Sequence, residues 1–337
     1  MLNTLKDLCV LDGVSGREHP VREYIQSKLS GIEYIDDMRT DALGNLLVHL
    51  KGKQAATKTL MIAAHMDEVG VIATGVTSDG FVRFAHVGGI DKAVLLGHRV
   101  RFGKHIGVIG GKAIHMCKGD EKSEIPSGDL LIDIGASSEE EAFEKVSIGD
   151  MAVFDSDFYE LGKLVKGRAI DDRAGCAVLL EIAKTQPAVD IWLAFTVQEE
   201  IGLHGAKTAS FAIAPDIGIV IDATTAADTV GVAHDKQVCR VYGGAVVSFM
   251  DRRTLYDKEL YDTVMATAKE NGIKAQPKSM VAGGNDAGAI QTAQGGVKVS
   301  AISLPCRYIH SPSCVAAIED LQAIYELVSA LIGRVAI

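Results

Sequence analysis

The chain has 337 residues, 47% of them hydrophobic and 23% charged, and its formal net charge is −10 at pH 7. This length exceeds what one compact core usually organises, so we expect two globular domains. The acidic balance, without a long Lys/Arg run, argues against nucleic acid or an anionic membrane as the main partner.

The first residues and the cysteines indicate a cellular compartment. Met1–Val10 has no continuous apolar block, so no signal peptide is predicted, and no later apolar run reaches membrane-spanning length. The cysteines form no C-x-x-C pair, which favours reduced thiols in a cytoplasmic protein over disulfides or sulfur-bound metal. The six are Cys9, Cys117, Cys176, Cys239, Cys306 and Cys314.

The first 68 residues predict two helices followed by strands. One helix begins near Asn3 and breaks at Gly13–Gly16, and the next covers Arg22–Leu29. A strand pair follows, with residues 41–50 as its second member. Residues 59–67, TLMIAAHMD, are an apolar run that ends abruptly in polar residues. This pattern is typical of a buried parallel strand whose C-terminal end opens into a site.

Residues 69–164 predict a small, mostly β domain inserted into another domain. Two strand-like runs flank Ser78–Gly80, which is a hairpin signal. Short strands and frequent glycines continue to residue 164, and only residues 137–146 predict a helix, with Ser137 or Ser138 as its N-cap.

After the insert, helices and strands alternate again. Strands separated by helices imply an α/β fold with a mostly parallel or mixed sheet and helices on both faces. We therefore expect a catalytic domain of residues 1–68 and 165–337, interrupted by a β-rich, barrel-like domain at 69–164. The predicted helices cover 171–185, 202–212, 258–272 and 316–335, and the predicted strands cover 190–197, 215–223 and 297–305.

Polar side chains follow four of the predicted strands. In open α/β sheets, ligands bind outside the carboxyl ends of the strands, so these clusters are expected to meet in one crevice. A further pair, Asp171 and Asp172, stands at the beginning of segment 171–185, in the loop that leads into its helix. The strand-end clusters are His65-Met66-Asp67, Gln198-Glu199-Glu200, Asp222 and His310.

This set of side chains suits metal ions. Two histidines and several carboxylates without a thiolate are ligands for one or two Zn²⁺, Co²⁺ or Mn²⁺ ions. Two ions about 3.5–4 Å apart need a carboxylate shared between them, and an extra carboxylate can act as a general base. Asp67 is placed to accept the other imidazole N–H of His65, as carboxylates near metal-bound histidines often do.

Each of these features alone has a structural explanation. A single His-x-Asp is often a surface hydrogen bond, a Glu-Glu pair is often a solvated face, and two aspartates can cap a helix. Their joint occurrence at strand and helix ends favours a metal site. His204 competes as a ligand, because a helix beginning at Glu200 would place both side chains on one face.

Six ordered segments resemble the tetrahedral (TET) aminopeptidases. That family includes the glutamyl aminopeptidases and some members once labelled endoglucanase. The resemblance runs nearly the whole length of the chain, from the first helix to the last. The segments are AAHMDEVG, GRAIDDRAGCAVLLE, TVQEEIGLHGA, VIDATTAAD, GGNDAGAI and PCRYIHSP.

The resemblance implies how two divalent metal ions, Zn²⁺ or Co²⁺ with Mn²⁺ as a further option, are held. His65 and Asp222 would bind one ion, Glu200 and His310 the other, and Asp171 would bridge them.

The resemblance also implies the catalytic roles. Glu199 would be the general base that takes a proton from a water bridging the metals and delivers it to the leaving amine. Asp67 would orient His65. The Asp171–Asp172 peptide is expected to be cis, as in similar enzymes.

Peptide substrates and self-association are implied in the same way. Region 69–164 resembles the family's dimerisation domain, and the family's dimers assemble into hollow twelve-subunit tetrahedra whose chamber admits peptides. Asn285 and Arg307 are the candidate substrate-binding residues. Asn285 stands where the family usually has Thr, and His204 stands where a basic residue is common, so the preferred N-terminal residue stays open.

Three alternatives to an aminopeptidase follow from the same residues. The nearest is another two-metal amide hydrolase, a carboxypeptidase or deacylase. A glycoside hydrolase would need two carboxylates and no metal. An inactive, self-assembling shell is the third, and the intact ligand set argues against it.

Overall fold

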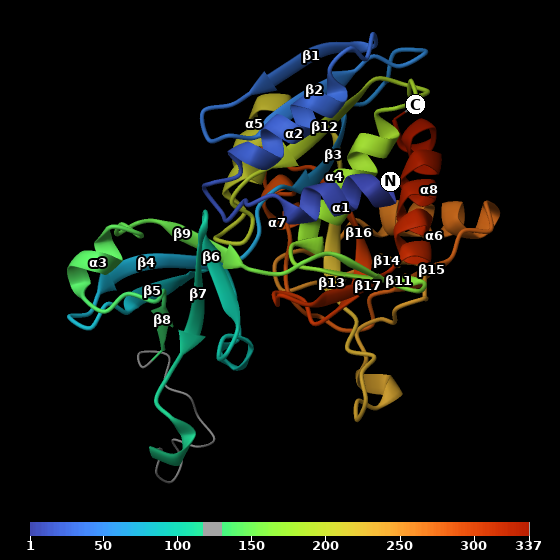
Figure 1. Ribbon diagram of the computed structural model, residues 1–337. Helices are drawn as coiled ribbons and strands as arrows, with labels where there is room; N and C mark the ends of the chain where they lie inside the picture. Colours follow the sequence, from blue (N-terminus) through green and yellow to red (C-terminus); the bar gives the residue numbers. More distant parts are fainter. Residues whose placement is uncertain (117–129, 337) are drawn as a thin grey trace.

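The computed structural model describes residues 1–116 and 130–336. Cys117 and part of the predicted insert therefore lie outside the described residues. Figure 1 shows a large α/β part, formed by both ends of the chain, and a smaller β part beside it. In the described residues no helix has the length and apolar character needed to cross a membrane.

The large part is built on an eleven-stranded mixed sheet. Its main path runs β1-β2-β12-β3-β13-β16-β17-β11-β10, and β14 and β15 attach beside β16. The strands are β1 (Ile35–Thr40), β2 (Leu46–Leu50), β3 (Leu60–His65), β10 (Tyr159–Leu161), β11 (Leu164–Gly167), β12 (Ile191–Thr196), β13 (Ile217–Thr225), β14 (Ala245–Val247), β15 (Ala275–Pro277), β16 (Lys298–Arg307) and β17 (Cys314–Ala317).

The centre of this sheet is parallel and its flanks are antiparallel. Strands β12, β3, β13 and β16 pair in parallel, whereas β1 with β2, and β16 with β17, pair antiparallel. In β3, Leu60, Ile62 and Ala64 face one hydrophobic core, and Met61 and Ala63 face the other. A strand covered on both faces needs a continuous apolar run, which explains the sequence of β3.

Helices cover both faces, as the sequence predicts. One core contains side chains of α1, α2, α4, α6 and α8, and the other contains side chains of α5 and α7. The helices are α1 (Leu2–Val10), α2 (His19–Leu29), α4 (Ile170–Ile182), α5 (His204–Ile213), α6 (Lys258–Glu270), α7 (Ala287–Ile290) and α8 (Ile318–Val335). In α4, a Cβ at Gly175 would lie 2.8 Å from the Ala64 side chain, so only glycine lets this helix approach the sheet.

The smaller part is a closed antiparallel barrel with strand order β4-β5-β8-β7-β6-β9. This confirms the predicted barrel-like insertion. Its short helix, α3 (Glu139–Phe143), begins at Ser138, whose hydroxyl accepts the N–H of Glu141 at 3.2 Å. The barrel strands are β4 (Gly70–Val76), β5 (Val82–Val87), β6 (Arg99–Phe102), β7 (His105–Gly110), β8 (Leu131–Asp133) and β9 (Met151–Phe154).

Two buried arginines fix the chain on either side of the segment that follows β3. Arg173 is fully buried and donates to the carbonyl oxygens of Leu8 at 2.6 Å and Met66 at 2.8 Å. Arg168 forms an ion pair with Glu68, which is also buried. A buried charge is tolerated only when paired and hydrogen-bonded. These contacts therefore hold α1, α4 and the end of β3 in fixed positions.

Candidate metal centre

The predicted metal-site residues lie around one cavity of about 310 Å³ at the carboxyl ends of the parallel strands. The elements that carry them are separate in the sequence. His65 ends β3, Asp171 lies in the first turn of α4, Glu199 and Glu200 follow β12, Asp222 lies in β13, and His310 lies between β16 and β17.

Three local details differ from the sequence expectation or refine it. Strand β13 continues to Thr225, so Asp222 lies inside the strand rather than after it; its residues beyond Ile221 remain paired with β16. Strand β12 ends at Thr196, so Glu199 and Glu200 belong to a loop. The Asp171–Asp172 peptide is cis, as the family resemblance implies.

Asp171 stands between two groups of possible ligands. Its Oδ1 is 3.1 Å from His65 Nε2, and its Oδ2 is 3.2 Å from His310 Nε2. Asp222 Oδ1 lies 3.7 Å from His65 Nε2, and Glu200 Oε1 lies 3.2 Å from His310 Nε2. The two oxygens of one carboxylate thus face two different sets of donors.

Main-chain carbonyl groups orient both imidazole rings. His65 Nδ1 is 3.1 Å from the carbonyl oxygen of Asp67, and His310 Nδ1 is 2.7 Å from that of Gly89. A carbonyl oxygen only accepts, so Nδ1 carries the proton in both rings. With Nδ1 engaged in this way, Nε2 is the ring nitrogen that faces the carboxylates and that a metal ion could bind.

The pKa shifts show how crowded this cluster is with negative charge. Burial raises the pKa of Asp222 to about 7 and that of Glu199 well above its usual value. Burial opposes protonation of His310, but the carboxylates of Asp171 and Glu200 outweigh it and raise the His310 pKa to about 11. A buried group of carboxylates with few cations is an environment that divalent ions stabilise.

The donor set fits two such ions. Three groups of side chains place ligand atoms within 4.8 Å of one another, and two of these groups share Asp171. All donors are imidazole nitrogens or carboxylate oxygens, which suit Zn²⁺, Co²⁺ or Mn²⁺. The groups are His65, Asp171 and Asp222; Asp171, Glu200 and His310; and His65, Glu199 and Glu200.

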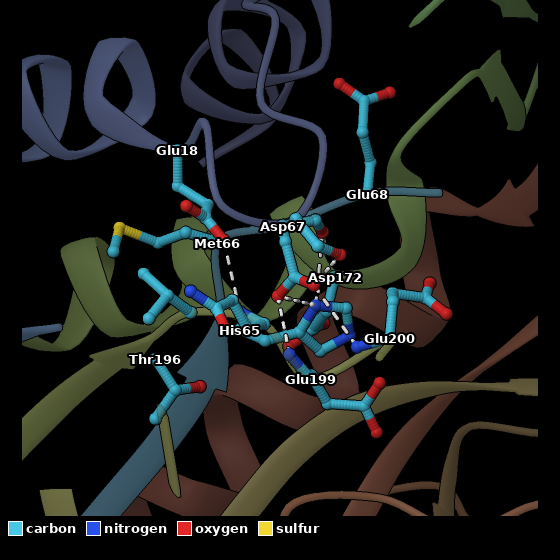
Figure 2. A network of polar contacts seen from close by, with 12 residues as sticks. Glu18, His65, Met66, Asp67, Glu68, Asp172, Thr196, Glu199 and Glu200 are labelled. Carbon is cyan, nitrogen blue, oxygen red and sulfur yellow. Dashed lines mark hydrogen bonds and ion pairs between the residues drawn. The ribbon is translucent and has the colours of Figure 1, made fainter. Parts of the chain in front are cut away.

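Two buried carboxylates hold the loop that carries Glu199 and Glu200. Asp67 accepts the backbone N–H of Glu199 at 3.0 Å and that of Glu200 at 3.1 Å, and Glu18 accepts that of Gln198 at 3.1 Å. Figure 2 shows this arrangement, with the Glu199 and Glu200 carboxylates pointing to different sides. Gln198 has a left-handed φ of 55°, so the loop conformation depends on these contacts.

Asp67 therefore contacts more than the histidine it was expected to orient. Its carboxylate is 3.4 Å from His65 Nδ1, whereas the main-chain carbonyl oxygen of Asp67 is only 3.1 Å from the same atom. The hydroxyl of Ser15 donates to the same carboxylate at 2.6 Å. The Asp67 carboxylate thus mainly holds the Glu199–Glu200 loop by hydrogen bonds, whereas the main-chain carbonyl of Asp67 holds the His65 ring.

The remaining predicted residues lie in different surroundings. Asn285 is buried and lines the cavity. Arg307 is engaged by Asp228, with 2.7 Å between Nε and Oδ1, and is not among the residues that line the cavity. His204 contacts the side chain of Gln198 at 3.1 Å and belongs to none of the three ligand groups among the described residues.

Two residues of this region were missed by sequence reasoning. Glu18 is the N-cap residue of α2 and contacts a loop 180 positions away, so no local pattern marks it. Lys278 follows the three-residue strand β15 and lines the cavity. A signal for Lys278 exists only in the pairing of β14 with β15 and β16, which brings it to the site.

Comparison with known proteins gives consistent matches over most of the chain. Residues 44–327 match the family model described as M42 glutamyl aminopeptidase. A protein of Acetivibrio thermocellus with a provisional aminopeptidase name is 40% identical, over 98% of both chains. The lysyl aminopeptidase of Pyrococcus furiosus is 32% identical over 97% of this chain and 95% of its own length. The glutamyl aminopeptidase of Lactococcus lactis is 32% identical over 96% of this chain and 93% of its own length.

Solved structures agree with these matches. An aminopeptidase from the archaeon Desulfurococcus kamchatkensis has a TM-score of 0.93 and 35% identity, over 98% of this chain and 94% of its own. The TET1 peptidase of Pyrococcus horikoshii, described as assembling into a tetrahedron or a large octahedral shell, has a TM-score of 0.85 and 36% identity over 98% of both chains. A Thermotoga maritima protein named endoglucanase has a TM-score of 0.81 and 35% identity over 97% of this chain and 96% of its own.

Proposed function

Because the chain belongs to the M42 glutamyl aminopeptidase family and is a metallo-aminopeptidase, we propose that it removes N-terminal residues from peptides with two divalent metal ions at the cluster around Asp171. One observation carries this proposal. Asp171 directs Oδ1 toward the group with His65 and Oδ2 toward the group with His310. A shared carboxylate of this kind is what a pair of ions about 3.5–4 Å apart requires.

Five side chains are the proposed ligands of the two ions. His65 and Asp222 would hold one ion, Glu200 and His310 would hold the other, and Asp171 would contribute to both. Two divalent ions bound there would polarise the scissile carbonyl and make a water molecule more acidic. Zn²⁺ and Co²⁺ fit the nitrogen and oxygen donors, and Mn²⁺ fits them as well.

Glu199 is the proposed general base. Its carboxylate has an oxygen within 4.8 Å of ligand atoms of His65 and Glu200, so it lies beside the proposed metal site. The Glu199 carboxylate takes a proton from the attacking water and returns it to the leaving amine nitrogen. The hydrogen bonds from the Glu199 and Glu200 N–H groups to Asp67 keep this base and the neighbouring ligand in place.

The barrel is the proposed self-association domain, with dimers that assemble into a dodecamer. Apolar side chains on its outer surface support this role: Ile106 is 50% exposed and Val108 is 43% exposed. The mass of the purified protein, measured by light scattering, tests this part separately. A monomer at micromolar concentration would contradict it.

The test of the proposed activity is hydrolysis of Glu-, Leu- and Lys-p-nitroanilide by the purified protein. Activity should disappear with a chelator and return with Co²⁺ or Zn²⁺. Absence of cleavage with any added metal, in folded and metal-containing protein, would contradict the proposal. Peptides with an acetylated N-terminus separate it from a carboxypeptidase or deacylase, because an aminopeptidase requires the free amine.

The Thermotoga maritima relative carries the name endoglucanase, which justifies one assay with a glycoside substrate. Hydrolysis of a β-glucan that persists in the presence of a chelator would favour the two-carboxylate mechanism. We expect none, because the carboxylates here are interleaved with two histidines whose Nε2 atoms face them.

A further inference from the structure

Lys278 is a buried cation in the wall of the substrate cavity. Its side chain is only 5% exposed, and it lines the same cavity as Glu199, Asp222 and His310. Its backbone N–H donates to the carbonyl oxygen of Val247 at 2.9 Å, which fixes its position at the end of β15. Apart from the two histidines of the metal cluster, no other described residue lining this cavity is basic.

The ammonium group of Lys278 has no partner among the described residues. No carboxylate forms an ion pair with it, and no oxygen accepts a hydrogen bond from it, although the cavity is rich in carboxylates. Other lysines of the chain do have such partners; the Lys166 ammonium group, for example, donates a hydrogen bond to Ser156 Oγ at 2.5 Å. A cation without a protein partner in the wall of a binding cavity can pair with an anionic ligand group.

The surroundings of Lys278 fit the side chain of one residue. Ala282, Gly283 and Gly284 line the same cavity with small side chains, and Asn285 and Ser303 line it with polar ones. The cavity of about 310 Å³ is at the low end of the range for ligand sites, roughly 300–1,000 Å³. A substrate group that reaches Lys278 must therefore lie close to the bond being cleaved.

We propose that Lys278 selects substrates whose N-terminal residue is acidic, by pairing with the side-chain carboxylate of glutamate or aspartate. The inference rests on the proposed aminopeptidase function. The matched relatives include both a glutamyl and a lysyl aminopeptidase, so family membership does not decide the preference. The carboxylate-rich side of the cavity attracts the substrate's α-amine and the metal ions, and Lys278 supplies the opposite charge for the acidic side chain.

The experiment compares kcat/KM for Glu- and Gln-p-nitroanilide, which differ only in the charge and donor character of the side-chain end. A hydrogen bond to a charged group makes Glu the better substrate of the wild-type protein by roughly 10- to 100-fold. A ratio near one, or a preference for Leu or Lys, would overturn the inference while leaving the aminopeptidase function intact. Failure to cleave any of these substrates would instead count against the proposed function.

Variants assign the preference to the residue. Lys278→Met should reduce the Glu/Gln ratio to near one, Lys278→Arg should retain part of it, and Lys278→Glu should favour Lys-p-nitroanilide. The matched control is Lys258→Met, because the Lys258 side chain is 79% exposed and does not line the cavity; its ratio should equal that of the wild type. An equal loss on all substrates in Lys278→Met, with normal melting temperature and metal content, would overturn the inference and leave Lys278 as a group that only neutralises the site.

A second source of the same carboxylate chemistry is the C-terminus of a short peptide. Leu-Gly and Leu-Gly-amide distinguish it from the N-terminal side chain. A loss of more than about tenfold on amidation, abolished in Lys278→Met, would assign Lys278 to the peptide C-terminus and overturn the acidic-residue preference. Equal rates for the two peptides support the side-chain assignment.

Discussion

Replacement of Asp67 by Asn should disturb the loop that carries Glu199 and Glu200 more than the proposed metal ligands. The Asp67 carboxylate is fully buried and accepts the N–H groups of Glu199 and Glu200. Asparagine keeps one oxygen and presents an NH₂ group at the other position, so one of these two N–H groups loses its acceptor in either amide orientation. His65 keeps its main-chain contact, because its nearest acceptor is the carbonyl oxygen of Asp67 at 3.1 Å.

The expected magnitude follows from the lost hydrogen bond. A hydrogen bond to a charged acceptor contributes about 1.5–3 kcal/mol, and leaving a buried donor without a partner adds to the loss. We expect the free energy of unfolding to fall by about this amount. A displacement of the base by 1 Å costs on the order of 100-fold in rate, so kcat should fall by roughly 10- to 100-fold.

The assay measures kcat, metal content and urea unfolding on the same preparation. Ser15→Ala is the matched control, because it removes the hydroxyl that donates to Asp67 at 2.6 Å and leaves both backbone hydrogen bonds in place. It should change kcat by less than about threefold. If Asp67→Asn loses metal but turns over normally when saturated with it, Asp67 acts through His65, and the reasoning from the loop is refuted.

The other predictions concern the base, the bridge and the buried arginine. Glu199→Gln should keep both metals and lose about 10²- to 10⁴-fold in kcat; a near-normal rate would remove Glu199 from this role. Asp171→Ala should lose metal as well as activity by elemental analysis and rate assay, and a fully metallated variant would contradict the bridge. Arg173→Met should lower the free energy of unfolding in urea by about 3–5 kcal/mol, because it leaves Glu68 and two carbonyl oxygens with fewer donors. Arg334→Met, which removes an exposed ion pair with Glu270, should change the free energy of unfolding little. An equal loss of stability in the two variants would show that the burial of Arg173 does not cause its effect.

The sequence predicts those parts of the fold that rest on local patterns. The apolar run of β3 is continuous because both faces of the strand are covered, and its end at His65 is marked by the change to polar residues. The end of β13 is predicted too early, because the strand predicted for 215–223 continues to Thr225 while paired with β16, and Asp222 lies inside it. Periodicity reports which faces are buried, and it does not report hydrogen bonds that continue beside a cavity.

The candidate site divides in the same way. Residues such as His65 and Glu200 stand out because each follows an apolar strand and has a chemistry that metals use. Glu18 and Lys278 do not stand out, because their positions depend on contacts between distant segments. Glu18 reaches Gln198 across 180 positions, and Lys278 follows a strand of only three residues, too short for a periodic pattern.

The use of main-chain acceptors leaves carboxylate oxygens of this cluster available for cations. If carboxylates held the two imidazole rings, fewer carboxylate oxygens would remain for metal ions. Carbonyl oxygens of Asp67 and Gly89 hold the rings instead, so Asp171 and Glu200 keep oxygens directed at the cluster. Gly89 follows barrel strand β5, and a Cβ there would lie 3.7 Å from the His310 ring. The segment that follows β5 thus sets the orientation of a predicted metal ligand, and His310 in the catalytic domain depends on a main-chain oxygen at the edge of the barrel.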